Sequence, residues 1–525
     1  MNEFETILEP VSNTCLRGLP YAQAHKCEDV LNIGIFFDGT DNNKSYHKAP
    51  NTNTNVARLW QAYRHSPGDG DSSIYVSGVG TPFTELGKKK AEGGGGIAGA
   101  GGEARIVYAL LEVINSIHRF LYGSKNPRFD VAQLAALCSE ARAPDPYRDN
   151  PREPTAEQKI LNQLGISQGL VSAGDRQFLG FVIEGPRRQF FRDIDLELRR
   201  QVMTQRPRIK AIYIDVFGFS RGAAQARVFV NWLHDLLLIR GQMFGAQACV
   251  RMLGLFDTVA SVGLSDAVGA KGHSAWATAQ NLRVHPEVRR CIHYIALHEL
   301  RTNFPVESVR RDGAIPQNCR ELFCPGAHSD VGGGYAPGEQ GKGVARVRNP
   351  YYPEIWDVVP DDRFKLSTLP LNLMYEEAKR AAEAHQNSPW IEFDSLEAED
   401  LDLGLRFGIA ALSTVPQAVA MYFAKSGVAE GLGTDEALRE HGLRYLAWRY
   451  SVTTGKEGFE KLASVERAQQ MDPRGFDHYR EGESIFKRQI RLLENPPQGI
   501  DWFKEKAEVA KYHEKSGEIY AQMKK

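Results

Sequence analysis

The chain has almost no excess of charge and few cysteines. It carries 64 Lys and Arg residues against 65 Asp and Glu residues in 525 positions. Because so even a balance produces no long-range field that attracts polyanions, we expect no nucleic-acid partner. The seven cysteines are scattered, with no CxxC pair and no His/Cys cluster at zinc-binding spacing. This scatter predicts reduced structural thiols and no zinc centre.

Segments that would direct the chain into or across a membrane are also missing. The first residues, MNEFETILEP, have neither the basic nor the apolar region of a secretory signal peptide. The least polar stretch, Phe407–Ala424, is too short and too polar to span a bilayer as a helix. We therefore expect a soluble protein that is made in the cytosol without a signal peptide.

Motifs for common cofactors are absent as well. The glycine-rich GAGGEA at Gly99–Ala104 lacks the Lys-Ser/Thr pair of a phosphate-binding loop. Asp38, Asp41 and Asp330 are acidic residues that could hold a hard cation, but no segment has EF-hand spacing. We predict that the chain uses neither a cofactor nor a metal ion.

Strand-like and helix-like segments alternate over residues 30–340. Short apolar runs rich in β-branched residues predict strands at Leu31–Phe37, Ser73–Ser77, Ile209–Phe217, Val250–Phe256 and Cys291–Leu297. Helical patterns lie between several of these runs. The alternation predicts an α/β fold built on a doubly wound, mainly parallel sheet. Beyond about Leu366 the strand-like runs stop and the patterns are helical.

These patterns predict that the chain is divided into three parts. We expect an irregular N-terminal segment at residues 1–29, a catalytic domain at 30–365 with a polar, Pro-rich insertion at about 124–185, and a mostly helical region at 366–525. The helical region carries apolar and aromatic residues at Leu405–Phe423, Tyr445, Trp448 and Tyr450. These residues would let it act as a lid or contact a membrane. The alternative is that they pack against the catalytic domain.

The clearest chemical signal is the sequence Gly218-Phe219-Ser220-Arg221-Gly222, a GxSxG motif. It follows the most apolar predicted strand and begins a helix at once, which is the context of a nucleophile elbow in an α/β-hydrolase fold. The sharp turn would lift the Ser220 hydroxyl out of the sheet, and the Arg221 N–H would stabilise an oxyanion at the helix N-terminus. The alternative is a serine that caps an ordinary helix.

A serine hydroxyl becomes a good nucleophile only when a base removes its proton, so a histidine is required. His328 has the most suitable setting, because it lies in a glycine-rich loop, PGAHSDVGGGY, after a short apolar run. Asp257 ends the predicted strand Val250–Phe256 and precedes the histidine in the chain, as the fold requires of the acid. Asp330 is the rival acid, although it lies close enough to His328 in sequence to cap its own turn.

The second oxyanion donor is expected in the loop after the first strand. Gly39 or Thr40 would supply the N–H, because the fold draws this donor from an N-terminal loop between strand and helix. A simple Asx-turn, in which Asp38 and Asp41 accept hydrogen bonds from backbone amides, is compatible with that role.

Five segments occur in a fixed order: IGIFFDGTDNN, YVSGVGT, GFSRGAAQAR, LGLFDTV and PGAHSDVGGGY. Together they resemble an uncharacterised α/β-hydrolase family and, within it, the first class of bacterial type VI secretion lipase effectors. The resemblance spans about residues 30–385 and places Ser220, Asp257 and His328 on the family's triad. It implies phospholipase activity at the sn-1 or sn-2 ester, delivery by a contractile apparatus into a rival cell's periplasm, a spike-protein partner and an immunity protein.

The predicted function is hydrolysis of glycerophospholipid acyl esters at a membrane surface by a serine hydrolase of the phospholipase A type. Such an effector would reside in the cytoplasm of the producing cell before secretion. Two alternatives remain open. One is a carboxylesterase that acts on esters other than phospholipids, and the other is a degenerate hydrolase retained as the adaptor of a secretion spike.

Overall fold

The structure of the chain is a computed structural model, and it describes residues 28–44, 52–90, 101–141, 153–172, 184–204, 208–260, 276–299, 304–384, 388–391, 415–454 and 458–473. Four expectations lie partly or wholly outside these residues. They concern the N-terminal segment 1–29, the parts of the insertion at 142–152 and 173–183, the apolar stretch before residue 415, and the part of the expected helical region after residue 473.

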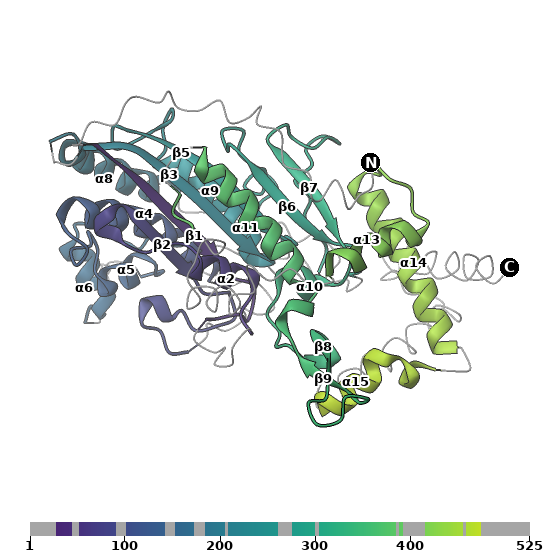
Figure 1. Ribbon diagram of the computed structural model, residues 1–525. Coiled ribbons are helices and arrows are strands. Elements are labelled where there is room, and N and C mark those ends of the chain that lie inside the picture. The colour runs from purple at the N-terminus through teal and green to yellow at the C-terminus, as the bar shows by residue number, and fades with distance from the viewer. Residues whose placement is uncertain are drawn as a thin grey trace, which may run out of the picture.

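A mainly parallel sheet runs through the middle of the molecule (Figure 1). Among the described residues it contains β1 (Glu28–Phe37), β2 (Asp71–Val76), β3 (Arg208–Phe219), β4 (Gln242–Met243), β5 (Ala246–Phe256), β6 (Cys291–Ala296) and β7 (Cys319–Cys324). The strand order is β2-β1-β3-β5-β6-β7, and every pair on this path is parallel, while β4 pairs antiparallel with β5. The predicted α/β fold is confirmed. The order reverses between β1 and β3, which is where such sheets open a crevice at the strands' carboxyl ends.

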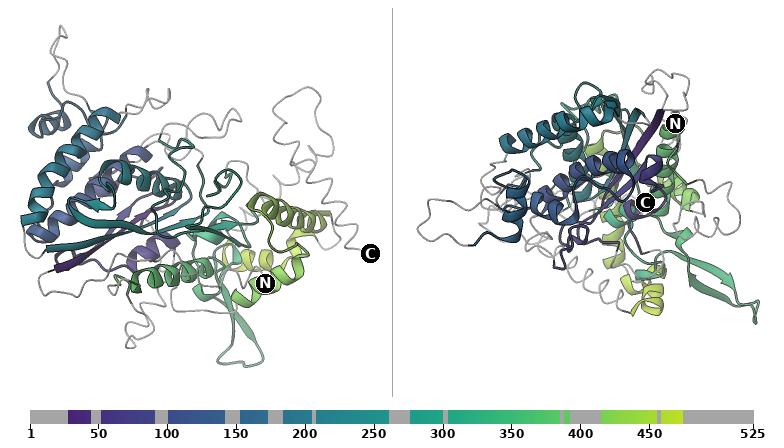
Figure 2. Two further views of the ribbon diagram at one scale, coloured as in Figure 1. Left: turned by 90° about the horizontal axis from the view of Figure 1, so that it is seen from above. Right: turned by 90° about the vertical axis from the view of Figure 1, so that its left-hand side faces the viewer.

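Both faces of the sheet are covered by helices (Figures 1 and 2). The helices nearest the strands are α2 (Asn55–Gln61), α4 (Gly102–Tyr122), α9 (Arg221–Leu236) and α11 (Thr368–Glu383). Ile33 and Ile35 of β1 pack into the same core as α4 and α9, whereas Phe36 packs into a second core with α2 and α11. Because successive side chains of a strand point to opposite faces, a strand buried on both sides is apolar throughout.

Other elements surround this framework. The remaining helices are α5 (Val131–Leu137), α6 (Ala156–Gln163), α8 (Glu184–Thr204), α10 (His328–Gly332), α13 (Val415–Ser426), α14 (Thr434–Thr454) and α15 (Ala463–Met471), with 3-10 turns at Pro67–Asp69, Thr84–Leu86, Glu339–Gly341, Asp362–Phe364 and Phe459–Lys461. In the expected insertion, Leu134 of α5 and Leu161 of α6 are buried in the core with α4. These two helices of the insertion therefore contribute to the packed interior.

A short hairpin, β8 (Val344–Arg348) and β9 (Trp356–Pro360), projects from the body of the molecule in both views of Figure 2. Large apolar side chains on it are exposed, namely Val347, Tyr351, Tyr352, Ile355 and Trp356. Tyr351 has 84% of its surface exposed, more than any other large apolar residue that the structure describes. The sequence patterns did not predict this hairpin.

The C-terminal elements are helical, as expected. Val419 and Phe423 of α13 are buried in the core that contains α11, while Met421 and Trp448 are about half exposed. Packing against the sheet domain thus accounts for part of the apolar stretch. Among the described residues, no helix combines the length and apolarity needed to cross a bilayer.

Candidate active site

Ser220 occupies a strained turn between β3 and α9. Its backbone angles are φ 58° and ψ −128°, a region that residues other than glycine rarely adopt. The Ser220 N–H donates to the Phe256 carbonyl at 3.0 Å, which ties the turn to the end of β5. A strand, a strained serine and an immediate helix are the local structure that a nucleophile elbow requires.

The two glycines of the motif are needed because backbone atoms pass very close to them. A Cβ on Gly218 would lie 2.5 Å from the Gly222 carbonyl oxygen. A Cβ on Gly222 would lie 2.4 Å from the carbonyl oxygens of both Phe37 and Asp38. Since backbone atoms cannot move aside as a flexible side chain can, larger residues at either position would distort the turn.

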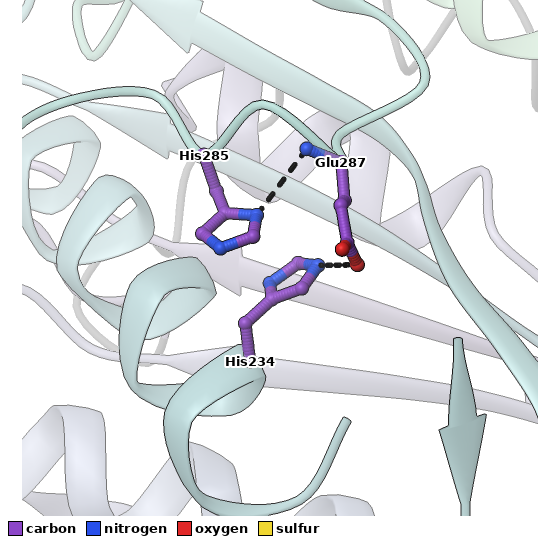
Figure 3. Close-up of side chains that lie close together, drawn as sticks. All are labelled: His234, His285 and Glu287. Atoms are coloured by element: carbon purple, nitrogen blue, oxygen red, sulfur yellow. Dashed lines mark hydrogen bonds and ion pairs between the residues drawn. The ribbon is translucent and has the colours of Figure 1, made fainter. Parts of the chain in front are cut away.

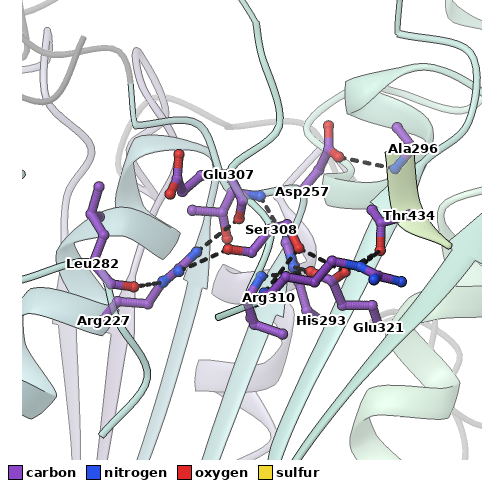
Figure 4. Close-up of polar contacts among 12 residues, drawn as sticks. Arg227, Asp257, Leu282, His293, Ala296, Glu307, Ser308, Arg310, Glu321 and Thr434 are labelled. Atoms are coloured by element: carbon purple, nitrogen blue, oxygen red, sulfur yellow. Dashed lines mark hydrogen bonds and ion pairs between the residues drawn. The ribbon is translucent and has the colours of Figure 1, made fainter. Parts of the chain in front are cut away.

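His328 and Asp257 are brought together at the same edge of the sheet. His328 begins α10, and its Nδ1 lies 2.6 Å from Asp257 Oδ2. The second carboxylate oxygen, Oδ1, accepts the Ala296 N–H at 2.9 Å (Figure 4). The two side chains are only 7% and 2% exposed. A buried carboxylate at Nδ1 keeps the proton on that nitrogen and leaves the Nε2 lone pair available to accept a proton.

Asp330, the rival acid, is engaged elsewhere. Its Oδ2 accepts the Ala327 N–H at 3.0 Å, and its Oδ1 accepts the Tyr335 hydroxyl at 3.2 Å. Lys342 Nζ lies 3.5 Å from the same Oδ1. Asp330 therefore holds its own turn together, and the carboxylate that reaches the His328 ring is that of Asp257.

The aromatic ring of Phe219 connects the loops of the site. It packs on the His328 ring with centroids 4.6 Å apart, and Phe304 lies against the same imidazole at 4.9 Å. A Cβ on Gly39 would lie 2.5 Å from the Phe219 ring, and one on Gly332 would lie 2.0 Å from it. Phe219 was not among the predicted site residues, although its place inside the GxSxG motif and the glycines on both loops were visible signals.

The Ser220 hydroxyl is enclosed. The residue is 3% exposed, and within the described part of the chain no hydrogen bond joins its Oγ to His328. In enzymes without substrate, hydrogen bonds between nucleophile and base are often long and tighten only when substrate binds. The Val259 N–H donates to the Ser220 carbonyl at 3.2 Å, which keeps the serine turn next to the Asp257 loop.

The expected oxyanion loop lies beside the serine turn. Arg221 Nε donates to Thr40 Oγ1 at 2.6 Å, which fixes the loop against the start of α9. The Gly39 N–H donates to Asp38 Oδ1 at 2.8 Å, whereas the Thr40 N–H donates to none of the described residues. Of the two predicted donors, Thr40 is therefore the one whose N–H is not used within the described loop.

Asp38 fixes this loop through hydrogen bonds to both of its carboxylate oxygens, as the Asx-turn interpretation expects. Besides the Gly39 N–H, it accepts the Thr54 hydroxyl at 2.6 Å and the Tyr75 hydroxyl at 2.5 Å. Burial, reinforced by the negative charge of Asp38, holds the pKa of Tyr75 well above its ordinary value, so the phenol stays a donor. Sequence patterns did not reveal Thr54 or Tyr75, because they reach Asp38 from separate segments.

A second polar network holds the residue that follows Asp257 in place. The Thr258 N–H donates to His293 Nε2 at 3.1 Å, so the proton of this imidazole lies on Nδ1, 3.1 Å from Glu321 Oε1. Glu321 also accepts the Val309 N–H. It accepts the Thr434 hydroxyl as well (Figure 4). Burial alone would raise the pKa of Glu321, but these hydrogen bonds outweigh it and lower the pKa to about 2. The first residue of α14 is thus connected to the residue that follows Asp257.

The three aspartates considered for a hard cation do not gather. Asp38 and Asp330 use both carboxylate oxygens on protein donors, and among the described residues neither they nor Asp41 form a group with metal-binding spacing. A different group, His234, His285 and Glu287, does have such spacing.

Comparison with known proteins gives one family and two structures. Residues 239–377 match the family described as the catalytic domain of Tle1-like phospholipase effectors of the type VI secretion system. This match confirms the resemblance predicted from the ordered motifs. It includes Asp257 and His328, while Ser220 and the loop at 38–41 lie before it. No curated protein matches the chain.

A crystal structure of an uncharacterized protein from Pseudomonas aeruginosa is similar with a TM-score of 0.60 and 24% sequence identity, and the alignment covers 94% of this chain and 62% of that one. It supports the fold alone, and this chain spans about three fifths of that protein's length. A structure of the Tle1 effector bound to the VgrG spike from the type VI secretion system aligns with a TM-score of 0.28 and 20% identity over 75% of this chain and 83% of that chain.

Proposed function

Because residues 239–377 match the catalytic domain of Tle1-like phospholipase effectors, we propose that this chain hydrolyses acyl esters of glycerophospholipids as a serine hydrolase of the phospholipase A type. The observation that carries the proposal is the buried 2.6 Å contact between His328 Nδ1 and Asp257 Oδ2. It lies at the same sheet edge as the strained Ser220 turn. A hydroxyl, an imidazole and a buried carboxylate from three separate loops are the parts that acyl transfer needs.

The proposed reaction has two halves. Ser220 Oγ attacks the ester carbonyl carbon while His328 Nε2 takes the hydroxyl proton, and Asp257 stabilises the imidazolium that forms. The N–H groups of Arg221 and Thr40 would stabilise the negative oxygen of the tetrahedral intermediate. The C–O ester bond then breaks, the lysophospholipid leaves with the proton from His328, and the acyl group remains on Ser220. Water, deprotonated by His328, attacks this acyl-enzyme and releases the fatty acid.

The exposed hairpin β8–β9 supports a lipid surface as the place of reaction. Tyr and Trp side chains favour the boundary between water and acyl chains, because their rings are apolar and carry a polar group. The loop of His328 continues through Lys342 into β8, so hairpin and candidate base belong to one stretch of chain. Arg346 and Arg348 are exposed on β8, and the Arg348 guanidinium lies over the Trp356 ring. Both arginines would face lipid phosphates.

Labelling and lipid turnover test the function. A fluorophosphonate should label the wild type at Ser220 and leave Ser220→Ala unlabelled. With vesicles of phosphatidylethanolamine carrying different sn-1 and sn-2 chains, mass spectrometry should find a lysolipid and one fatty acid, which also assigns the position cleaved. An unlabelled wild type would favour the adaptor alternative. Turnover of soluble short-chain esters without release of fatty acid from vesicles would favour the carboxylesterase alternative.

Secretion and partners are part of the same proposal. The motif resemblance implies transfer into a target cell's periplasm, a spike protein that carries the chain and an immunity protein that blocks it. Expression of the chain with an added periplasmic leader should arrest growth of a host bacterium, while cytoplasmic expression and the Ser220→Ala variant should not. Equal toxicity of wild type and Ser220→Ala would contradict a hydrolytic effector.

A further inference from the structure

A group of histidines lies at the end of the sheet opposite the candidate active site. Helix α9 begins next to Ser220, and His234 is near its last turn, about 20 Å further along the helix axis. His285 and Glu287 lie in the loop that leads into β6, which places them at the amino ends of the parallel strands. The catalytic proposal uses none of these three side chains.

The protonation of His234 is fixed by its surroundings. Its Nδ1 lies 2.8 Å from the Val230 carbonyl, and because a carbonyl only accepts, Nδ1 carries the proton. The opposite nitrogen, Nε2, is buried and has no hydrogen-bond partner among the described residues, and it lies 3.9 Å from Glu287 Oε2 (Figure 3). Burial lowers the pKa of His234 to about 4, so at neutral pH an unprotonated lone pair faces a carboxylate.

His285 adds a third lone pair. Its ring stacks on His234 with centroids 3.8 Å apart, and its Nδ1 accepts the Glu287 N–H at 3.3 Å (Figure 3). Burial lowers the pKa of His285 as well, so this ring is also neutral at pH 7. One ligand atom from each of the three residues lies within 4.8 Å of the others. The buried Nε2 of His234 faces the Glu287 carboxylate, 3.9 Å away, and a cation between these two acceptors would stabilise both.

We propose that His234, His285 and Glu287 bind one divalent transition-metal ion of the zinc class, with water as the remaining ligand. Imidazole and carboxylate are ligands that Zn²⁺ prefers, whereas Mg²⁺ and Ca²⁺ select oxygen donors. The bond from His234 Nδ1 to a backbone carbonyl is the outer-shell contact that metal-binding histidines usually make. Glu287 also lines a cavity of about 670 Å³, so ions and water can reach the group from its carboxylate side.

Small movements would complete the coordination. Tetrahedral ligands at zinc distances are about 3.3 Å apart, compared with the 3.9 Å between His234 and Glu287. Glu287 is 58% exposed and therefore able to approach. Because the two rings are stacked, one of them has to turn before both lone pairs point at one ion. His285, which is half-buried on a loop, is the ring that would turn, since Val230 holds His234. Its Nδ1 would then exchange the Glu287 N–H for the ion.

The ion would stabilise structure and would not act on substrate. Asn231 of α9 already donates to the carbonyls of Asn281 and Arg283 in the same loop, at 2.7 Å each. An ion at His234 adds a second connection one turn later, between the end of α9 and the segment that leads into β6. We therefore expect metal to raise thermal stability and to leave the hydrolysis rate of the folded protein unchanged.

Metal titration tests the site. After EDTA treatment of the full chain without an affinity tag, calorimetry should find one Zn²⁺ per chain and no comparable Mg²⁺ binding. Cobalt substitution should give the intense visible absorption of a tetrahedral N/O site. His285→Gln and Glu287→Gln should each weaken Zn²⁺ binding by about 10- to 100-fold and remove the zinc-dependent rise in Tm.

A matched variant excludes general surface binding. His118→Gln changes a histidine of α4 outside the group and should bind Zn²⁺ like the wild type. The proposal is wrong if the wild type shows no saturable Zn²⁺ binding, if His285→Gln and Glu287→Gln bind as the wild type does, or if Mg²⁺ binds as tightly as Zn²⁺. Both variants change side chains outside the fully buried core, so we expect both to fold. Equal Tm values of the variants and the wild type without metal would verify that they do.

Discussion

Asp257 has two structural tasks at the residue scale, and each uses one carboxylate oxygen. Oδ2 contacts His328 Nδ1, and Oδ1 accepts the Ala296 N–H of the neighbouring strand. Its backbone φ of 41° is a conformation that few residues other than glycine adopt. The carboxylate thus positions the imidazole and also joins the ends of β5 and β6.

Replacing this acid by its amide should separate the two candidates. Asp257→Asn should lower kcat by about 10⁴, because an amide NH₂ at Nδ1 favours the wrong imidazole tautomer. Asp330→Asn should lower kcat by less than about 10-fold, since Asp330 holds only its own turn. Rates of vesicle phospholipid hydrolysis measure both effects, provided that each variant has the same Tm as the wild type. A severe effect of Asp330→Asn with a mild effect of Asp257→Asn would reverse the assignment.

The glycine after the nucleophile gives a prediction about stability. Gly222→Ala brings a methyl group to 2.4 Å from two carbonyl oxygens and should destabilise the fold by about 3 kcal/mol or more. Gly68→Ala is the matched control, because apart from its chain neighbours no described residue comes within 4 Å of the added methyl group. Chemical denaturation measures both variants. Equal stability of the two would mean that the turn has more space than the structure gives it.

Single residues could be predicted from the sequence where a reactive side chain directly follows a strand-like run. Ser220 and Asp257 each follow a predicted strand, and His328 follows a short apolar run that forms β7, so parallel pairing brings them to one edge. Their catalytic roles stay predictions, and the structure adds the contact between two of them. Phe219 and Tyr75 were missed because their partners come from loops whose positions depend on which strands are neighbours. The group of His234, His285 and Glu287 was missed because His234 lies far from the other two residues in the sequence.

At the scale of elements, Glu321 of β7 connects the sheet with the C-terminal helices. Its carboxylate accepts hydrogen bonds from His293 of β6, the Val309 N–H and Thr434 at the start of α14. A pKa of about 2 in the folded chain lies below the usual value of a free glutamate. Its contribution to stability is therefore complete above about pH 4.5 and is lost as the pH falls toward 2.

Neutralising Glu321 should remove this pH dependence. Glu321→Gln should lower the stability at pH 7 by on the order of 3 kcal/mol, with a lower Tm, and the gap to the wild type should narrow between pH 4.5 and pH 3. Glu436→Gln, an exposed change on the same helix, serves as control and should alter Tm little. Calorimetry across this pH range measures the effect. A gap that stays constant with pH would exclude the proposed linkage.

We expect the hairpin β8–β9 to contribute to hydrolysis of phospholipid in vesicles but not to hydrolysis of soluble esters. The double variant Tyr351→Ser/Trp356→Ser should lower hydrolysis of vesicle phospholipid by about 10-fold or more, because it removes exposed rings that favour the lipid boundary. Turnover of a soluble short-chain ester should stay within twofold of the wild type. Parallel assays with both substrates separate docking from chemistry. Equal losses on both would mean that the hairpin supports the active site itself.

At the scale of the whole molecule, the sequence predicted the kind of sheet but not its order. Apolar runs show which segments are buried, and alternation with helices shows that the strands are parallel. The order β2-β1-β3-β5-β6-β7 depends on pairing between segments as far apart as β1 and β3. The hairpin was missed because its strands carry exposed apolar residues, the reverse of the pattern that marks a buried strand.

One further consequence follows from the continuous stretch that joins His328 to the hairpin. Between residues 328 and 360 the chain first supplies the imidazole, then leaves the body of the protein and presents aromatic rings to the outside. Attachment through those rings would fix not only where the protein sits but also which way it faces. Every molecule held at a bilayer by this tip would have the same orientation, so binding and aiming would be a single event.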